Sequence, residues 1–327
     1  MRRFVALGLG VLLSTSIKAQ DEARYADLVK HAYVLYEQKD FKGSAETYSK
    51  AFEALGWKGT SNDRYNAACS WALAGVPDSA FFNLERIAQL MDYANVAHLT
   101  TDADLNSLHT DARWAPLVAQ VQANKDRLEA NYDKPLVALL DSIFDEDQTL
   151  RRSIGEVEAK YGRDSKEMQQ LWRTMAEKDS TNLIVVTRIL DERGWLGEDV
   201  VGGKGNSALF LVIQHSDQAT QEKYLPMMRD AVAKGNARGS SLALLEDRVA
   251  LGQGKRQTYG SQIGDDPGSG HLCVLPLDDP DHVDERRAAV GLGTLAEYIT
   301  NWDMTWDVEA YKRELPALEE RIKSRRK

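Results

Sequence analysis

The hydrophobic pattern of the chain is densest between Val201 and Asp217, where the sequence reads VGGKGNSALFLVIQHSD. Every residue from Ala208 to Ile213 is apolar, so a helix formed here is buried on all sides. Gln214, His215 and Asp217 follow immediately. Because polar groups delivered into a core need polar partners, we expect a cluster of polar side chains at the end of this run.

Between Glu22 and Met91 apolar residues recur at three- and four-residue steps, which predicts helices. The pattern repeats with a period near 34, since Ala32 to Ala67 and Ala45 to Ala80 are both 35 residues. Two helices per unit at this period resemble the tetratricopeptide repeat, in two degenerate units over residues 22–57 and 62–91, followed by a short closing helix over 102–117. Such units stack to complete a small core. The resemblance implies a concave face that binds a peptide or protein partner. The alternative is that the repeat domain serves only as a docking surface for the second domain.

A polar, charged stretch from Gln120 to Lys134 precedes Pro135, which suits the first turn of a new helix. We therefore expect a repeat domain over 20–130 and a second domain over 131–327. The second domain is predicted to contain further helices over about 135–152, 165–178, 180–194, 202–214, 221–233 and 240–251, with Asp179–Ser180 capping the third of these.

The period changes after residue 254. Lys255 to Ile263 alternates and is rich in β-forming residues, and His271 to Leu277 is a second apolar run. The turn-forming residues between them predict a β-hairpin near 255–277, with Gln257, Tyr259 and Ser261 on one face and Thr258 and Gln262 on the other. The fold class expected is mainly α, with tetratricopeptide-like repeats followed by a helical domain carrying one small hairpin.

The first 19 residues have the features of a secretory signal peptide. A basic start is followed by an apolar segment over 4–13 and small residues up to Ala19. Because the apolar segment is shorter than the about 20 residues of a membrane span, we expect cleavage, no membrane span and a secreted or periplasmic protein. Only Cys69 and Cys273 are present, too few for a disulfide framework, and two free thiols are favoured over a bridge.

Cleavage after Ala19 leaves 38 basic against 50 acidic residues, a net charge of −12. A chain this acidic has no overall field for nucleic acid, so a nucleic-acid partner is not expected.

Several short motifs of the second domain occur in an order that resembles a known bacterial family. The chain resembles the domain of unknown function 6624 over about residues 133–300, on these residues: Asp147, Gln148, Arg151, Asn182, Gly194, Trp195, Val201, Gly202, Gln214–Asp217, Asp247, Arg248, Gln257, Tyr259–Gln262, Val283, Asp284, Arg286, Arg287, Gly291 and Leu292. The resemblance implies no activity, because the family has none established.

Burial predicts that the polar residues of the second domain converge on one pocket. His215 and Asp247 are the candidate catalytic pair, an acid orienting a histidine base at a helix end. The candidate ligand-binding residues are Gln214, Arg151, Arg248, Gln257, Tyr259 and Gln262, whose amides, phenol and guanidinium groups suit a polar or anionic ligand. A buried network that only holds the helices together is the alternative.

No metal and no cofactor are expected. His215 and Asp217 are close in sequence, but no second histidine follows at the spacing of a zinc site, and His271 and His282 are distant. The leading functional hypothesis is an exported protein whose repeat domain docks or recruits a protein, and whose second domain binds a small polar or anionic ligand. The alternative is a periplasmic hydrolase that uses His215 and Asp247 in acid–base chemistry.

Overall fold

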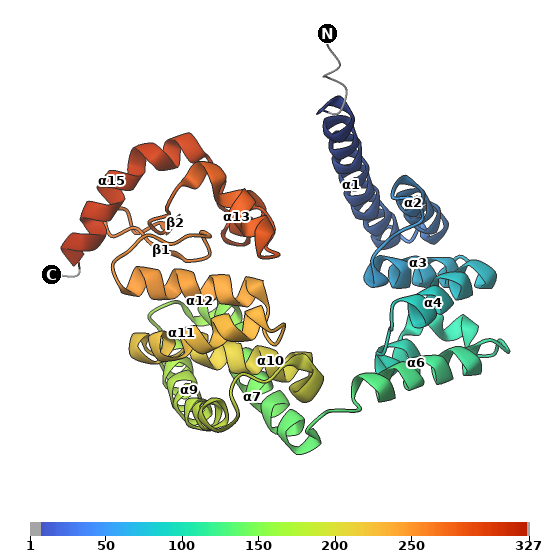
Figure 1. The fold of residues 1–327 in the computed structure, drawn as a ribbon, viewed down its shortest axis with the longest axis horizontal. Coiled ribbons are helices and arrows are strands. Elements are labelled where there is room, and N and C mark those ends of the chain that lie inside the picture. Colours follow the sequence, from blue (N-terminus) through green and yellow to red (C-terminus); the bar gives the residue numbers. More distant parts are fainter. Residues whose placement is uncertain (1–7, 326–327) are drawn as a thin grey trace, which may run out of the picture. The chain divides into compact units, whose positions relative to one another are not determined.

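Figure 1 shows the computed structural model of the chain, which describes the backbone of residues 8–325 and the side chains of residues 20–325. The chain divides into two compact units, Met1–Ala130 and Asn131–Lys327. Helices dominate both units, and the described residues form one small antiparallel sheet, which confirms the mainly α fold class. Over that part of the chain, none of the helices combines the length and hydropathy that a membrane crossing requires.

The first unit is built from helices throughout. They are α1 (Gly8–Glu37), α2 (Phe41–Ala54), α3 (Ser61–Leu73), α4 (Pro77–Leu90), α5 (Val96–Thr101), the 3₁₀ helix η1 (Ala103–Leu108) and α6 (Trp114–Leu128). Side chains cap the starts of two of these helices: Asp40 accepts from the Gly43 amide, and Thr60 accepts from the Asp63 amide. The four alanines spaced by 35 residues are all fully buried where the helices pack: Ala32, Ala45, Ala67 and Ala80.

Two expectations for this unit meet a different structure, and a third falls partly outside the described residues. The predicted closing helix over 102–117 is divided between η1 and the start of α6. The polar stretch from Gln120 onward is mostly the exposed face of α6, so only residues 129–133 lack helical structure at the boundary. Residues 1–7 of the predicted signal peptide lie outside the described residues, and the backbone of 8–19 belongs to α1.

The helices of the second unit surround the apolar run predicted to be central. They are α7 (Lys134–Arg152), α8 (Ile154–Tyr161), α9 (Lys166–Arg193), α10 (Glu198–Gln214), α11 (Gln218–Ala233) and α12 (Gly239–Gly252). Helix α10 carries the run and contacts α7, α9, α11 and α12. Leu209 and Ile213 of α10 are fully buried against Leu140 of α7, Leu190 of α9 and Leu245 of α12.

Two helix boundaries differ from the prediction. Asp179 and Ser180 do not cap a new helix, because α9 runs through them, and the Ser180 hydroxyl donates to the Ala176 carbonyl 2.8 Å away. Helix α10 begins at Glu198 and kinks at Gly202, whose φ is +70°. With its ψ of 164°, this φ lies in a region essentially restricted to glycine, which explains a glycine at the kink.

The last third of the second unit packs on its own core of Val274, Leu277, Val283, Leu295 and Ile299. Its elements are β1 (Ile263–Asp265), β2 (Leu272–Val274), η2 (Pro280–His282), α13 (Val283–Ala289), α14 (Leu295–Ile299), η3 (Thr300–Trp302) and α15 (Val308–Arg325). Strands β1 and β2 are antiparallel, with Ile263 opposite Val274.

The predicted first strand over 255–263 is wrong for all but its last residue. Residues 257–262 form an irregular loop, apart from a single bridge between Gln257 and Leu277. The amides of Thr258, Tyr259 and Ser261 bond to a carboxylate and have no strand partner. Alternating faces therefore do not apply to this segment.

Candidate functional site

The C-terminus of α10 is where the predicted polar cluster forms. His215 is the residue that ends the helix, and its Nδ1 lies 2.9 Å from Oδ1 of Asp147 on α7. The Asp147 side chain is 2% exposed, and its other oxygen accepts from Gln148 Nε2 at 2.7 Å. No partner of His215 Nε2 is found within residues 20–325, and the side chain retains 19% exposure. The pair is therefore an oriented imidazole with one nitrogen available.

Three partners keep Asp147 ionised in spite of its burial. Burial by itself raises the pKa of a carboxyl group, but hydrogen bonds from His215 and Gln148 and the positive charge of Arg151 outweigh it, so the pKa of Asp147 is lowered. The sequence-based pairing of His215 with Asp247 is thus corrected: the acid that orients His215 is Asp147. The motif Asp147-Gln148-x-x-Arg151 contained the signal, since it places acid and arginine one helical turn apart.

Arg151 is fully engaged by two carboxylates. Its Nη1 lies 2.9 Å from Asp147 Oδ1, and its Nη2 donates to both oxygens of Asp179 at 2.9 and 3.1 Å. Asp179 reaches Arg151 because α9 continues through it, so the residue expected to cap a helix instead neutralises the arginine. Sequence analysis did not identify Asp179 as part of the cluster.

Arg248 has no such neutralisation. Its Nη1 donates to the Gln214 carbonyl at the end of α10 at 2.9 Å, and its Nε donates to Gln262 Oε1 at 3.2 Å. Both acceptors are uncharged, and no carboxylate pairs with Arg248 among the described residues. Burial lowers the pKa of Arg248, and the positive charge of Arg151 lowers it further. Its guanidinium nevertheless stays charged, because arginine is protonated at any ordinary pH.

Gln214 and Gln262 complete the contacts of the cluster. Both amide nitrogens donate to the Leu244 carbonyl at 3.4 Å, from α10 and from the loop respectively. Gln214 is 3% exposed, and its buried Oε1 has no hydrogen-bond partner in the part of the chain that the structure describes. The structure therefore brings together Gln214, His215, Arg248 and Gln262, with Arg151 linked to them through Asp147.

Asp247 has a different role from the one predicted. It is fully buried, and its carboxylate accepts from the amides of Thr258 at 2.7 Å, Tyr259 at 2.9 Å and Ser261 at 2.9 Å. Burial raises the pKa of Asp247, against the lowering effect of these bonds. The residue fixes the loop of residues 257–262, hereafter the 257–262 loop, and has no carboxylate oxygen left for His215.

Gln257 is also a structural residue of this loop. Its side chain is fully buried, donates to the carbonyls of Gln262 and Leu275 at 3.0 and 2.8 Å, and accepts from the Gln262 amide at 2.8 Å. These bonds occupy its amide, so Gln257 is not placed to bind a ligand. Its role is instead to close the loop.

Two arginines hold the 257–262 loop by its backbone carbonyls, whereas Asp247 holds it by its amides. Arg286 donates to the Thr258 carbonyl at 2.9 Å, and Arg287, which is 1% exposed, donates to the Tyr259 carbonyl at 2.7 Å. The Tyr259 phenol lies near Glu246, and burial followed by that charge raises the pKa of Tyr259. The motif residues Arg286 and Arg287 thus act on backbone carbonyls, which sequence analysis did not foresee.

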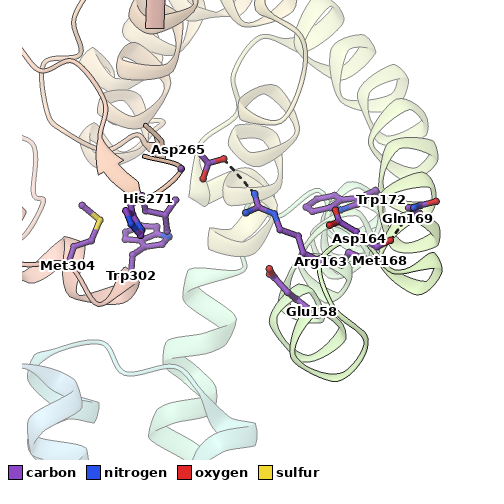
Figure 2. Close-up of a pocket in the computed structure, with 12 residues that line it drawn as sticks. Glu158, Arg163, Asp164, Met168, Gln169, Trp172, Asp265, His271, Trp302 and Met304 are labelled. Carbon is purple, nitrogen blue, oxygen red and sulfur yellow. Dashed lines mark hydrogen bonds and ion pairs between the residues drawn. The ribbon is translucent and has the colours of Figure 1, made fainter. Parts of the chain in front are cut away.

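A cavity of about 890 Å³ opens elsewhere in the second unit (Figure 2). Met168 and Trp172 of α9 line one side, and His271, Trp302 and Met304 line the other. Arg163 reaches from the first side to Asp265 at 3.6 Å. Of the predicted candidates only His271, considered as a distant metal ligand, lines the cavity. His282 is exposed and pairs with Asp279 at 3.0 Å.

The cavity and the polar cluster lie along the same helix face. Asp179, the partner of Arg151, follows Trp172 by seven residues on α9, which is two helical turns and a rise of about 10 Å. Residues at this spacing project from the same side of a helix. Sequence analysis missed Trp172 and Trp302, because single tryptophans in helical patterns indicate core packing more often than a cavity wall.

Comparison with known proteins identifies a family that the second unit matches. A family model described as a family of unknown function (DUF6624) covers residues 134–310, which includes the polar cluster, the 257–262 loop and the cavity. No curated protein and no solved structure matches the chain.

Proposed function

The chain belongs to the family of unknown function DUF6624, and we propose that its second unit binds a small anionic ligand at Arg248 and His215. The family description names no activity, so the proposal rests on the geometry of these residues. The observation that carries the proposal is the contrast between two neighbouring arginines. Arg151 is neutralised by two carboxylates, whereas Arg248 is half-buried and bonded only to neutral oxygens. A partly desolvated guanidinium without a counter-charge is costly unless an anion joins it.

His215 supports the same ligand. Its Nδ1 is held by Asp147, so the ring orientation is fixed, and Nε2 is available to donate to or accept from a bound group. Arg248 binds the Gln214 carbonyl, which directly precedes His215. The two side chains therefore approach the same helix end, where they would meet one small ligand such as a phosphate or a carboxylate.

Calorimetric titration of the full chain with inorganic phosphate, sulfate and acetate tests the proposal. At least one anion should bind, and Arg248→Gln should weaken it by about tenfold to a hundredfold, the range for losing a charge-assisted bond. Arg238→Gln is the matched control, because Arg238 is an exposed arginine of the same unit that pairs with Glu198. Equal losses in both variants, or no binding by any anion, would contradict the proposal.

A hydrolase is the alternative function, and the Asp147–His215 pair is the observation that favours it. A carboxylate on Nδ1 holds the ring so that Nε2 can accept a proton from water, and Arg248 could stabilise the charge that develops. With p-nitrophenyl phosphate and p-nitrophenyl acetate as probes, turnover should fall by about 10²- to 10⁴-fold in His215→Gln. Turnover that His215→Gln leaves unchanged would exclude this role.

The proposal for the first unit is that it docks or recruits a protein and that its helix pairs are tetratricopeptide-like. Support comes from the pairs α1–α2 and α3–α4, whose buried alanines are spaced by 35 residues. A pull-down with the full chain should recover a partner that a chain lacking this unit does not. Recovery of the same partner by the second unit alone would assign docking elsewhere.

Export is proposed on the character of the first 19 residues alone. The mature protein isolated from the producing cell should begin at Gln20 and occur outside the cytoplasm. Intact mass spectrometry of the fractionated cell checks both points. A protein that retains Met1 in the cytoplasmic fraction would contradict the proposal.

A further inference from the structure

The first unit contains a cavity of about 300 Å³ whose walls combine phenol rings and carboxylates. Tyr33 and Tyr36 come from α1, Tyr48 from α2 and Tyr65 from α3, while Asp102 lies between α5 and η1 and Asp104 lies in η1. We infer that this cavity binds the cationic side chain of a lysine or arginine presented by a protein partner. The inference rests on the proposal that the first unit recruits a protein, and it names the chemistry of that contact.

The charge of the cavity is the first argument. Three other aspartates of the same unit pair with arginine: Asp78 and Asp111 with Arg113, and Asp92 with Arg127. Asp102 and Asp104, in contrast, pair with no lysine or arginine within residues 20–325. The one basic group near them is His98, whose Nε2 is 3.7 Å from Asp102 Oδ2. Two carboxylates with this little compensation favour a cationic ligand.

The hydrogen bonds of the tyrosines are the second argument. Tyr36 donates its phenol proton to Asp104 Oδ2 at 2.7 Å, and Tyr65 donates to Asp102 Oδ2 at 3.0 Å. The bond to Asp104, followed by burial, raises the pKa of Tyr36, and burial raises the pKa of Tyr65. Both phenols therefore stay protonated and fix the two carboxylates in place. The aromatic walls add their own attraction for a positive group, which is strongest where water is excluded.

A metal ion is the competing occupant of this cavity. The Sγ of Cys69 lies close enough to Asp102 and Asp104 for the three groups to hold a metal ion. The chelator control in the experiment below distinguishes a metal ion from a cationic side chain.

Size and access fit a single side chain. The volume is at the lower end of small-ligand sites, which span about 300–1,000 Å³, so the cavity suits one long side chain better than a bulky ligand. Tyr33 leaves 56% of its surface exposed while it lines the cavity, whereas Tyr48 and Tyr65 are buried inside. An exposed tyrosine beside buried ones is typical of the rim of a protein-binding pocket.

Fluorescence anisotropy of the full chain with labelled peptides Gly-Gly-X-Gly-Gly tests the inference, where X is lysine, arginine, leucine or glutamate. The lysine or arginine peptide should bind at least about tenfold more tightly than the leucine and glutamate peptides, and a chelator should change nothing. Asp102→Asn and Asp104→Asn should each weaken that binding by about tenfold, which is a modest loss for one charge contact. Asp111→Asn is the control, because it removes the same charge outside the cavity and should have no effect.

Three results would overturn the inference. They are equal binding of all four peptides, an equal loss in Asp111→Asn, and loss of binding on addition of chelator, which would indicate a metal ion. Thermal melting identifies a variant that fails to fold, and the folded one of Asp102→Asn and Asp104→Asn then decides the test. If Asp102→Asn still recovers the same partner in a pull-down, the proposal that the first unit docks a protein would stand. Only the inference that this cavity makes the contact would be rejected.

Discussion

Asp147 and Asp247 are both buried carboxylates of the second unit, yet their partners differ in kind. The partners of Asp147 are the side chains of His215, Gln148 and Arg151. Side chains can change conformation when a ligand binds. Asp247 bonds to the backbone amides of Thr258, Tyr259 and Ser261, so its carboxyl group is a fixed part of the fold. The two acids should therefore respond differently to substitution.

Asp247→Ala should lower the free energy of unfolding by roughly 3 kcal/mol or more. The substitution leaves three buried amides without an acceptor, each worth about 1–3 kcal/mol. Urea unfolding of the wild type and the variant measures the difference. His215→Ala is the comparison, and its cost should be below about 1 kcal/mol, because Asp147 retains Arg151 and Gln148. A larger loss in His215→Ala than in Asp247→Ala would reverse the assignment of roles.

Asp147 should make stability depend on pH in acid. Its folded pKa is lowered, so its contribution is fully present above the ordinary pKa of 3.8 and is lost as pH falls through the folded value. Asp147→Asn should therefore be less stable than the wild type at pH 7, by roughly 1–3 kcal/mol, and the difference should shrink towards pH 2. Urea unfolding at several pH values checks this, and a difference that stays constant with pH would contradict it.

The elements that sequence predicted best are those with a strong apolar stripe. The run in α10 is central because apolar residues on every side leave a helix no solvent-facing side. The failures occurred where side chains compete for backbone groups. Asp179 and Ser180 suit a helix cap, but Ser180 bonds inside the helix and Asp179 finds Arg151. Such choices depend on a partner that is distant in sequence, so local pattern does not determine them.

The strand prediction for residues 257–262 was wrong for a related reason. Its alternation fits a strand, but Asp247 supplies the acceptors that a neighbouring strand would otherwise provide. The sequence predicted part of the candidate site. His215, Gln214, Arg151, Arg248 and Gln262 do meet, because burial demands partners for polar groups, whereas the identity of each partner came only from the structure.

The kink in α10 should be sensitive to a side chain at Gly202. Its φ of +70° is strained for any other residue, while a Cβ there would meet only Tyr132 at ordinary contact distance of 3.5 Å. Gly202→Ala should therefore cost about 1–2 kcal/mol through backbone strain alone. Gly155→Ala in α8 is the control, since its φ is ordinary and its surroundings are open, and it should be neutral or stabilising by up to about 1 kcal/mol. Thermal melting of both variants distinguishes strain from crowding.

At the scale of the whole molecule, the short segment between the units should be the first to be cleaved. Helix α6 ends at Leu128 and α7 begins at Lys134, and Asp133 is already tied to Arg193 and to the Val200 carbonyl. A protease of broad specificity should cut near Ala130 and Asn131, which are exposed, and leave two resistant fragments, because exposed segments between compact units are preferred sites. Gel electrophoresis with mass spectrometry reads the fragments, and cleavage confined to residues 205–262 would contradict the division.

The 257–262 loop has no helix or strand, and yet Asp247 holds its backbone amides while Arg286 and Arg287 hold its carbonyls. The rate of amide hydrogen exchange depends on how often such hydrogen bonds open, whether or not the residues belong to a helix or strand. The amides of Thr258, Tyr259 and Ser261 should consequently exchange about as slowly as those in the middle of α12. An irregular segment of this protein would then be among its most rigid, and a ligand at Arg248 would meet a surface that is ordered before it arrives.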